Sequence, residues 1–163
     1  PVSEDVLKSV LEAVKWSPSW ANTQCWEIVV VTDPELKARL QQEAVPKSNP
    51  AHKAVGSAPV VLALCARLNE AGYYKGQVTT KFGDWFMFDL GIAAQNLSLA
   101  AHSLGLGTCY IGLIDGLMMY PNYRKQLGIA PPFEIVTALT LGYPQGRIDN
   151  IVAREQARIE WIE

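Results

Sequence analysis

Apolar residues recur along the chain at two spacings, one typical of helices and one typical of buried strands. After Ser3, a helix-capping residue followed by two acids, valines and leucines recur every three or four positions as far as Val14. This pattern predicts a first helix that ends before Pro18. Three mainly apolar runs predict buried strands: residues 27–32, 59–66 and 134–141.

The longest predicted helix runs from Trp85 to Leu104 and is apolar on nearly every side, and Gly105 is placed to end it. A helix of that character lies at the centre of a protein or in an oligomer interface. A short helix, a short strand and another short helix are predicted at residues 36–43, 108–111 and 123–127. The mixture predicts one α+β domain over residues 1–163, with helices flanking a central sheet.

Composition supports a single domain and narrows its setting. The 163 residues are 49% hydrophobic and 18% charged, which is enough for a full core. A net charge of -2 disfavours a broad surface for nucleic acid or for an anionic membrane. Three widely spaced cysteines form no CxxC unit and no disulfide framework, so we expect a reducing, cytoplasmic setting.

Several classes of chemistry have no motif in this chain. Only two histidines, His52 and His102, are present, without a close cluster of cysteines or carboxylates, so no metal site is expected. No GxSxG, Walker or GxGxxG sequence supports a hydrolase, a nucleoside triphosphatase or a Rossmann domain. An enzyme with so few nucleophiles and bases depends on a cofactor for its chemistry.

Three polar or glycine-bearing segments lie at the edges of apolar elements. The first contains Ser19, Asn22 and Gln24, neutral groups that suit a flat heterocycle with donor and acceptor edges. The alternative is a plain turn in which Ser19 and Asn22 bond to their own backbone. The second, residues 104–113, has glycines that either let backbone approach a ligand or simply end a helix. The third, residues 141–154, has arginines that either bind a phosphate or are solvated.

Taken together, these segments resemble the nitroreductase family of flavin enzymes. Residues 13–26 (AVKWSPSWANTQCW) are similar to the family's alanine-x-x-alanine-proline-serine-x-x-asparagine-x-glutamine-proline-tryptophan loop. The other two matches are residues 91–97 running into 100–112, and Leu141-Gly142-Tyr143-Pro144. Their order and spacing agree with the family over nearly the whole chain.

The resemblance implies a homodimer with two FMN sites at the subunit interface, each flavin contacted by both chains. It implies a nitroreductase-like fold with a mixed or antiparallel central sheet and the long helix at the dimer interface. No side chain is expected to be catalytic, and a backbone amide of Gly112 or Leu113 would lie near flavin N5. The implied FMN-binding residues are Pro18, Ser19, Trp20 and Asn22 against the ring, Gln24 supporting their loop, Tyr110, Ile111, Gly112 and Leu113 on the other side, and Arg147 or Arg154 at the phosphate.

The implied activity is hydride transfer from NADH or NADPH, through FMN, to a flat acceptor such as a nitroaromatic or a quinone, in a ping-pong cycle. Two departures from the family pattern stand out. The family's arginine-x-serine-x-arginine stretch would precede Pro1, so we expect the natural protein to begin earlier. Cys25 stands where proline is usual, and we interpret it as a small buried residue. The aromatic-rich stretch at residues 73–88 is predicted to serve mainly in core packing.

Three alternatives remain open on the sequence. The same fold carries other flavin chemistry in relatives, namely reductive dehalogenation and flavin fragmentation. A non-enzymatic flavin-binding protein is the second alternative, because the basic start is absent. A purely structural interaction protein is the third, and it depends only on the apolar long helix.

Overall fold

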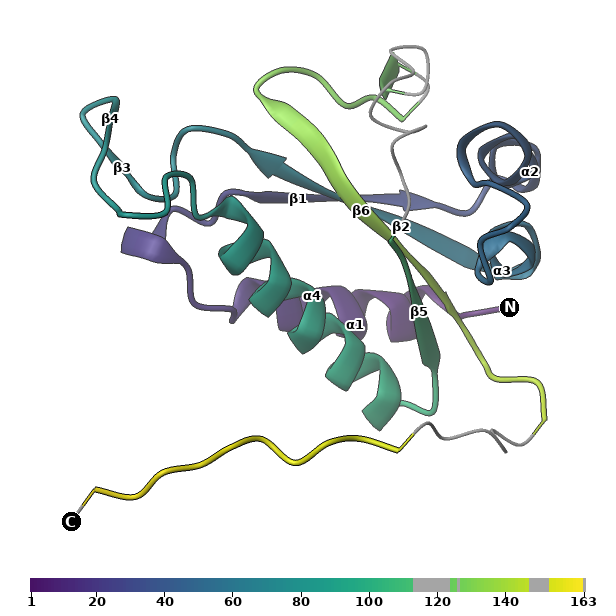
Figure 1. Ribbon diagram of the computed structural model, residues 1–163. Coiled ribbons are helices and arrows are strands. Elements are labelled where there is room, and N and C mark those ends of the chain that lie inside the picture. The colour runs from purple at the N-terminus through teal and green to yellow at the C-terminus, as the bar shows by residue number, and fades with distance from the viewer. Residues whose placement is uncertain (113–123, 126, 147–152, 163) are drawn as a thin grey trace.

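The computed structural model describes residues 1–112, 124–125, 127–146 and 153–162. Its main sheet has the strand order β1-β2-β6-β5, and every neighbouring pair is antiparallel. The strands are β1 (Trp26–Val31), β2 (Val60–Arg67), β5 (Gly107–Ile111) and β6 (Phe133–Gly142). The α+β class with a central antiparallel sheet is therefore confirmed (Figure 1).

Helices cover both faces of this sheet. On one face, α1 (Glu4–Lys15) and α4 (Phe86–Ser103) pack together against the strands, as Figure 1 shows. The other face is covered by α2 (Pro34–Ala44) and α3 (His52–Ser57). Among the described residues, no helix has both the length and the apolar character that crossing a bilayer requires.

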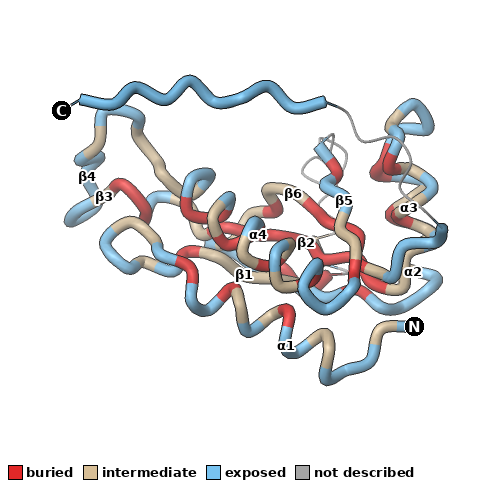
Figure 2. The backbone as a smooth tube through the Cα atoms, turned by 90° about the horizontal axis from the view of Figure 1, so that it is seen from below, coloured by how far each residue is buried: buried red, intermediate tan, exposed pale blue. Residues whose placement is uncertain are grey.

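The two apolar cores meet at β2, the most deeply buried strand. Leu62 and Leu64 point toward α1 and α4, whereas Val61, Ala63 and Cys65 point toward α2 and α3. A strand buried on both sides needs apolar residues at every position, because its side chains alternate between the faces. This is why its sequence, VVLALCAR, lacks an apolar–polar alternation, and why the buried band of Figure 2 runs through the sheet.

The strongly apolar elements, the short strand at 108–111 and the short helix at 36–43 were all predicted to within about two residues. That helix begins at Pro34, and Asp33 caps it by accepting from the Leu36 amide. No prediction covered α3. Nor did any prediction cover the small hairpin of β3 (Tyr73–Tyr74) and β4 (Gln77–Val78), which lies in the segment between β2 and α4. The predicted helix at 123–127 lies partly outside the described residues.

Core packing was the wrong expectation for several aromatic residues of the 73–88 stretch. Tyr74, Phe82 and Phe88 are 64%, 77% and 59% exposed. Phe86 does pack against the core between α1, α4 and the sheet, and Trp85 makes an edge-to-face contact with Phe88 at 5.1 Å between ring centroids. Tyr74 lies on β3, Phe82 lies between β4 and α4, and Phe88 lies in the first turn of α4.

Candidate functional site

Residues 18–24, which we call the 18–24 loop, connect α1 to β1 in an unusual backbone conformation. A single turn of 3-10 helix, Trp20–Asn22, lies at its centre. Ala21, Asn22 and Gln24 have φ values of 46°, 56° and 47°. Side chains with a Cβ resist this left-handed region, at a cost of about 1 kcal/mol or more for each residue. Such a conformation persists only where other interactions hold it.

Two hydrogen bonds inside the loop contribute to holding it. Ser19 Oγ accepts from the Gln24 backbone amide at 3.0 Å, and Gln24 Nε2 donates to Asn22 Oδ1 at 3.0 Å. Ser19 therefore bonds to its own loop's backbone, as the plain-turn interpretation expects, and Asn22 bonds to a side chain instead. Gln24 supports the loop in the way the family resemblance implied. Asn22 and Gln24 remain exposed, so their other polar groups face solvent.

Two side chains of helix α4 hold the 18–24 loop and the residue before it. The Asp89 carboxylate, which is fully buried, accepts from the Trp20 amide at 3.0 Å and 3.1 Å through its two oxygens, and from Thr23 Oγ1 at 3.5 Å. Two turns further along the helix, Asn96 Nδ2 donates to Ser17 Oγ at 2.9 Å. Residues 89 and 96 lie on the same side of an α-helix, so the loop is attached along one edge of α4.

Cys25, directly after the loop, is fully buried and directs its thiol toward Asp89, with Sγ and Oδ2 3.9 Å apart. Burial, reinforced by the Asp89 charge, raises the pKa of this thiol to about 11. At neutral pH it is therefore a protonated, weakly donating group. The interpretation of Cys25 as a small buried residue fits this environment.

The second predicted segment forms the end of α4 and strand β5. Gly105 ends the helix with a φ of 77°, as expected of a glycine at that position. Tyr110 is 44% exposed, and its hydroxyl lies 3.4 Å from Ser98 Oγ on α4. Ile111 is buried in the core, and its carbonyl accepts from Thr137 Oγ1 at 3.2 Å. Gly112 is exposed, and a Cβ added there would meet nothing within 4 Å.

The structure describes only part of the third segment. Gly142 ends β6 against Pro59, and Tyr143 is 51% exposed. Arg154 is exposed, and the chain at residues 153–162 is extended (Figure 1). Leu113 and Arg147 lie outside the described residues. Among the described residues, no group of three histidine, cysteine or acidic side chains could hold a metal ion.

Within one chain the first two segments lie against different parts of the same helix. The 18–24 loop is anchored at Asp89, whereas Tyr110 approaches Ser98. These two helix positions are nine residues apart, or about 14 Å of helix rise. Figure 1 accordingly shows the loop near the start of α4 and β5 beside its end. Within one chain these two segments, which we call the candidate half-sites, are therefore separate.

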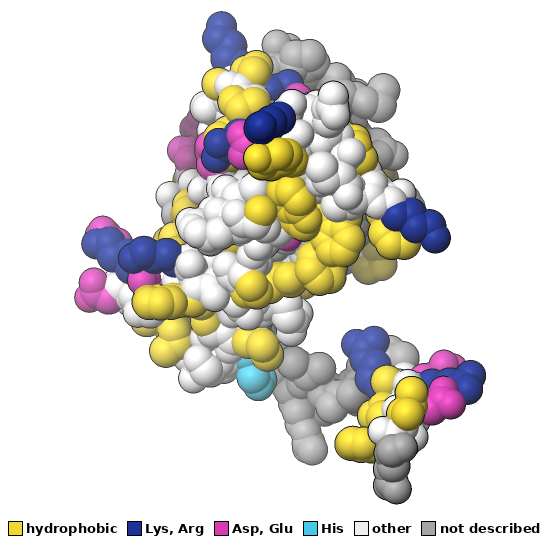
Figure 3. Space-filling model, turned by 90° about the vertical axis from the view of Figure 1, so that its left-hand side faces the viewer, with side chains coloured by type: hydrophobic (Ala, Val, Ile, Leu, Met, Phe, Trp, Pro, Cys, Tyr) yellow, Lys and Arg dark blue, Asp and Glu magenta, His cyan; other side chains and the backbone are white. Residues whose placement is uncertain are grey.

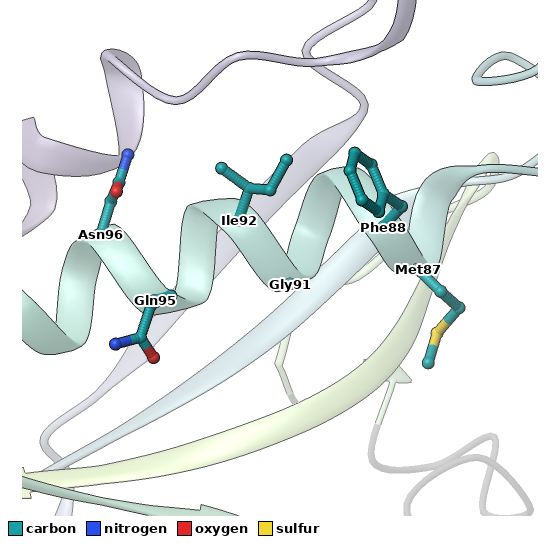
Figure 4. Close-up of a pocket in the computed structure, with 6 residues that line it drawn as sticks. All are labelled: Met87, Phe88, Gly91, Ile92, Gln95 and Asn96. Carbon is teal, nitrogen blue, oxygen red and sulfur yellow. The ribbon is translucent and has the colours of Figure 1, made fainter. Parts of the chain in front are cut away.

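The outward side of α4 between these half-sites is largely apolar, and no other described part of the chain covers it. Met87, Phe88 and Leu99 are 60%, 59% and 58% exposed. A depression of about 460 Å³ lies on this stretch, lined by Met87, Phe88, Gly91, Ile92, Gln95 and Asn96. Figure 4 shows Phe88, Ile92 and Asn96 projecting to one side of the helix and Met87 and Gln95 to the other. Hydrophobic side chains gather in a band across this side of the molecule (Figure 3).

Comparison with known proteins identifies the class to which this fold and these half-sites belong. The profile of the Nitroreductase family matches residues 1–50 and 41–143. This chain belongs to the nitroreductase family, as the resemblance of its three segments predicted.

Individual relatives agree with the family assignment. The chain is 30% identical over 157 residues to the FMN reductase [NAD(P)H] of Bacillus subtilis, which covers 90% of this chain and 60% of that protein. It is similar to the FMN-dependent nitroreductase structure from Clostridium difficile R20291, with a TM-score of 0.68, 25% identity, and 90% and 79% of the two chains covered. A nitroreductase family protein from Streptococcus pneumoniae TIGR4 shares the fold, with a TM-score of 0.74, 22% identity, and 94% and 86% covered.

Sequence reasoning missed the groups that hold the loop in place, namely Asp89, Asn96 and Ser17. A helical period does not identify them, because α4 is apolar on nearly every side and has no clear polar face. One signal was available. Asp89 is the only charged residue between Phe86 and Ser103, and a lone carboxylate in an apolar helix is either paired or costly.

Proposed function

We propose that this chain is one subunit of a homodimeric FMN-dependent oxidoreductase that passes hydride from NADH or NADPH to a flat acceptor such as a nitroaromatic or a quinone. The family membership and the names of its relatives support the cofactor, the donor and the class of reaction. The observation that carries the proposal is the preformed 18–24 loop, whose neutral polar groups are held in left-handed geometry above α4.

The residues present fit a tricyclic ring with donor and acceptor edges. Pro18, Asn22 and Gln24 are exposed and uncharged, and together they offer an apolar surface and two amides. On the second half-site, the open space at Gly112 lets a ring approach the backbone closely, next to the exposed Tyr110. Neutral groups of this kind bind a heterocycle without imposing a fixed charge on it.

Two copies of the chain complete one site in this proposal. The 18–24 loop of one subunit would cover the ring on one side, and Tyr110, Ile111 and Gly112 of the other subunit would line it on the opposite side. The apolar face of α4 would lie in the interface, because its exposed Phe88 and Leu99 need a partner surface. A twofold axis through this face would place the 18–24 loop of each subunit beside the second half-site of the other, so that one dimer would contain two sites.

The protein's own work in this scheme is orientation and charge stabilisation. FMN, when bound, supplies the hydride chemistry. Pro18, Ser19, Trp20 and Asn22 would hold the ring in register, with Gln24 supporting them. A backbone amide of Gly112 or Leu113 would face the reacting nitrogen, and backbone amides, a helix end or a nearby cation would stabilise negative charge elsewhere on the reduced ring. A tail arginine, Arg147 or Arg154, would bind the phosphate. The nicotinamide and the acceptor would occupy the same open face in turn.

Visible spectroscopy of the purified protein tests this function directly. We expect a flavin absorbance band at one FMN per chain that bleaches on anaerobic addition of NADH or NADPH and returns when a quinone or a nitroaromatic is added. A colourless protein that ignores added FMN would contradict the proposal. If FMN binds but NADH or NADPH does not bleach it, the result would support the binding site and exclude the reaction.

A matched pair of variants localises the site. Asn22→Asp places a negative charge on the loop's outer side and is expected to weaken FMN binding about tenfold or more, because a desolvated charge is costly without a partner. Asn69→Asp is the control. Asn69 is also exposed and also has a left-handed backbone, with φ of 62°, but it lies in the segment between β2 and α4. Equal loss of FMN in both variants would count against the loop.

A further inference from the structure

We propose that Asp89 is the positioning residue of the cofactor site, a buried carboxylate on α4 that sets the shape of the 18–24 loop before FMN binds. The inference rests on the proposed function for the identity of the ligand. It assigns to Asp89 a role exerted through the loop and not through contact with the flavin.

The donors around Asp89 show why a carboxylate stands there. The Trp20 amide, the Thr23 hydroxyl and the Cys25 thiol all direct hydrogen toward its two oxygens. An ionised carboxylate accepts through both oxygens and donates nothing, so it satisfies three converging donors at once. An asparagine has the same shape but presents an NH₂ group, which would face a donor on one side.

Holding a charge at this place is costly, which argues against a role in stability alone. Asp89 is fully buried, and Asp84 exerts a like-charge effect on it. Burial raises the pKa of the Asp89 carboxyl, and the hydrogen bonds from Trp20, Thr23 and Cys25 oppose this effect. Because no lysine or arginine of the described residues pairs with Asp89, its charge is retained where its hydrogen bonds fix a geometry.

The geometry that Asp89 fixes is the strained part of the loop. The Trp20 amide lies at the start of the 3-10 turn, and the left-handed Ala21, Asn22 and Gln24 follow directly. A free loop would relax toward ordinary φ values, and a ligand would then have to restore the strained shape on binding. Because the hydrogen bonds to Asp89 already hold the loop in this shape, FMN binding would cost less free energy for ordering the loop.

Hydrogen exchange in the flavin-free protein tests the anchor itself. Asp89→Asn is expected to increase exchange of the amides of residues 19–24 about tenfold or more, because one charged hydrogen bond holds about that factor. Lys37→Met is the matched control. Lys37 is also buried, and its Nζ donates to the carbonyls of Ala58 and Pro59 at 2.7 Å and 2.9 Å on the α2 side of the sheet. This control should lower overall stability yet leave exchange in the loop within about twofold of wild type.

FMN titration of the same proteins tests the consequence for the site. We expect about tenfold or greater weakening in Asp89→Asn and less than about twofold change in the folded Lys37→Met protein. Unchanged loop exchange in Asp89→Asn overturns the inference, and so does fast loop exchange with wild-type FMN affinity. If wild type binds no FMN, the proposed function fails, while loop exchange still decides whether Asp89 is the anchor.

A milder variant covers the case in which Asp89→Asn does not fold. Thr23→Val keeps the shape of the side chain and removes one donor to Asp89. The expected result is about threefold faster exchange at residues 19–24 and a loss of FMN affinity in the same proportion. Thr23→Val with wild-type values in both assays would overturn the inference.

Discussion

At the scale of single residues, burial decides the chemistry of the three cysteines. Cys25 and Cys65 are fully buried, and Cys109 is exposed on β5. Burial raises the pKa of Cys25 to about 11 and that of Cys65 to about 12, with nearby carboxylates adding to both shifts. Only the thiolate is nucleophilic, so a raised pKa makes a thiol unreactive at neutral pH. The apparent departure of Cys25 from the family's proline therefore introduces no reactive group.

Thiol labelling checks this assignment. At pH 8, only about one Cys25 thiol in a thousand is ionised, so a soluble disulfide reagent should modify Cys109 alone in the native protein and all three cysteines after unfolding. The free energy of unfolding should also fall as the pH rises from 9 toward 11, because thiols ionise in the unfolded chain before they do in the folded one. Native labelling of a second cysteine at pH 8 would contradict the assignment.

At the scale of elements, one glycine of the Leu-Gly-Tyr-Pro segment serves packing and not a ligand. A Cβ on Gly142 would lie 2.7 Å from Pro59 Cδ and 2.9 Å from its Cγ. The end of β6 passes this close to the start of β2 because Leu141 pairs with Val60 in the ladder. A proline ring is rigid, so one of the two strands would have to move.

Chemical denaturation of two alanine variants tests this close approach. Gly142→Ala is expected to lower the free energy of unfolding by about 1–3 kcal/mol, the usual cost of overpacking. Gly56→Ala is the control. Its Cβ would meet only the flexible end of Gln41, which can turn away, so we expect a change within about 0.5 kcal/mol. Equal midpoints for Gly142→Ala and wild type would show that the strands separate without cost.

The secondary-structure elements were predicted from the sequence more fully than the candidate site was. Strands β1, β2 and β6 and helix α4 were predicted because each is a strongly apolar run whose length distinguishes a strand from a helix. Helix α3 has six residues, too few to show a helical period. The loop was found by its match to the family. Its anchor was not, because the contact between Asp89 and Trp20 joins positions 69 residues apart.

At the scale of the whole molecule, the single chain leaves its long helix half covered. Buried residues of α4, such as Leu90, Ala93 and Leu97, face α1 and the sheet, whereas Met87, Phe88 and Leu99 face outward. The same helix contacts both half-sites, at positions about 14 Å apart along its axis. A second copy placed against this face would cover the apolar side chains and complete two sites together, so assembly and cofactor binding should be linked.

Charge placed on the α4 face should therefore separate the subunits and release the cofactor together. We expect Leu99→Glu to weaken dimerisation at least about a hundredfold, because a carboxylate buried without a partner costs several kcal/mol. Val78→Glu is the matched control, since Val78 on β4 is 52% exposed, close to the 58% of Leu99. Sedimentation velocity would report the subunit state and absorbance the bound FMN. A Leu99→Glu protein that stays dimeric and keeps its flavin would place the interface elsewhere, whereas a monomer that keeps its flavin would show that one chain binds FMN alone.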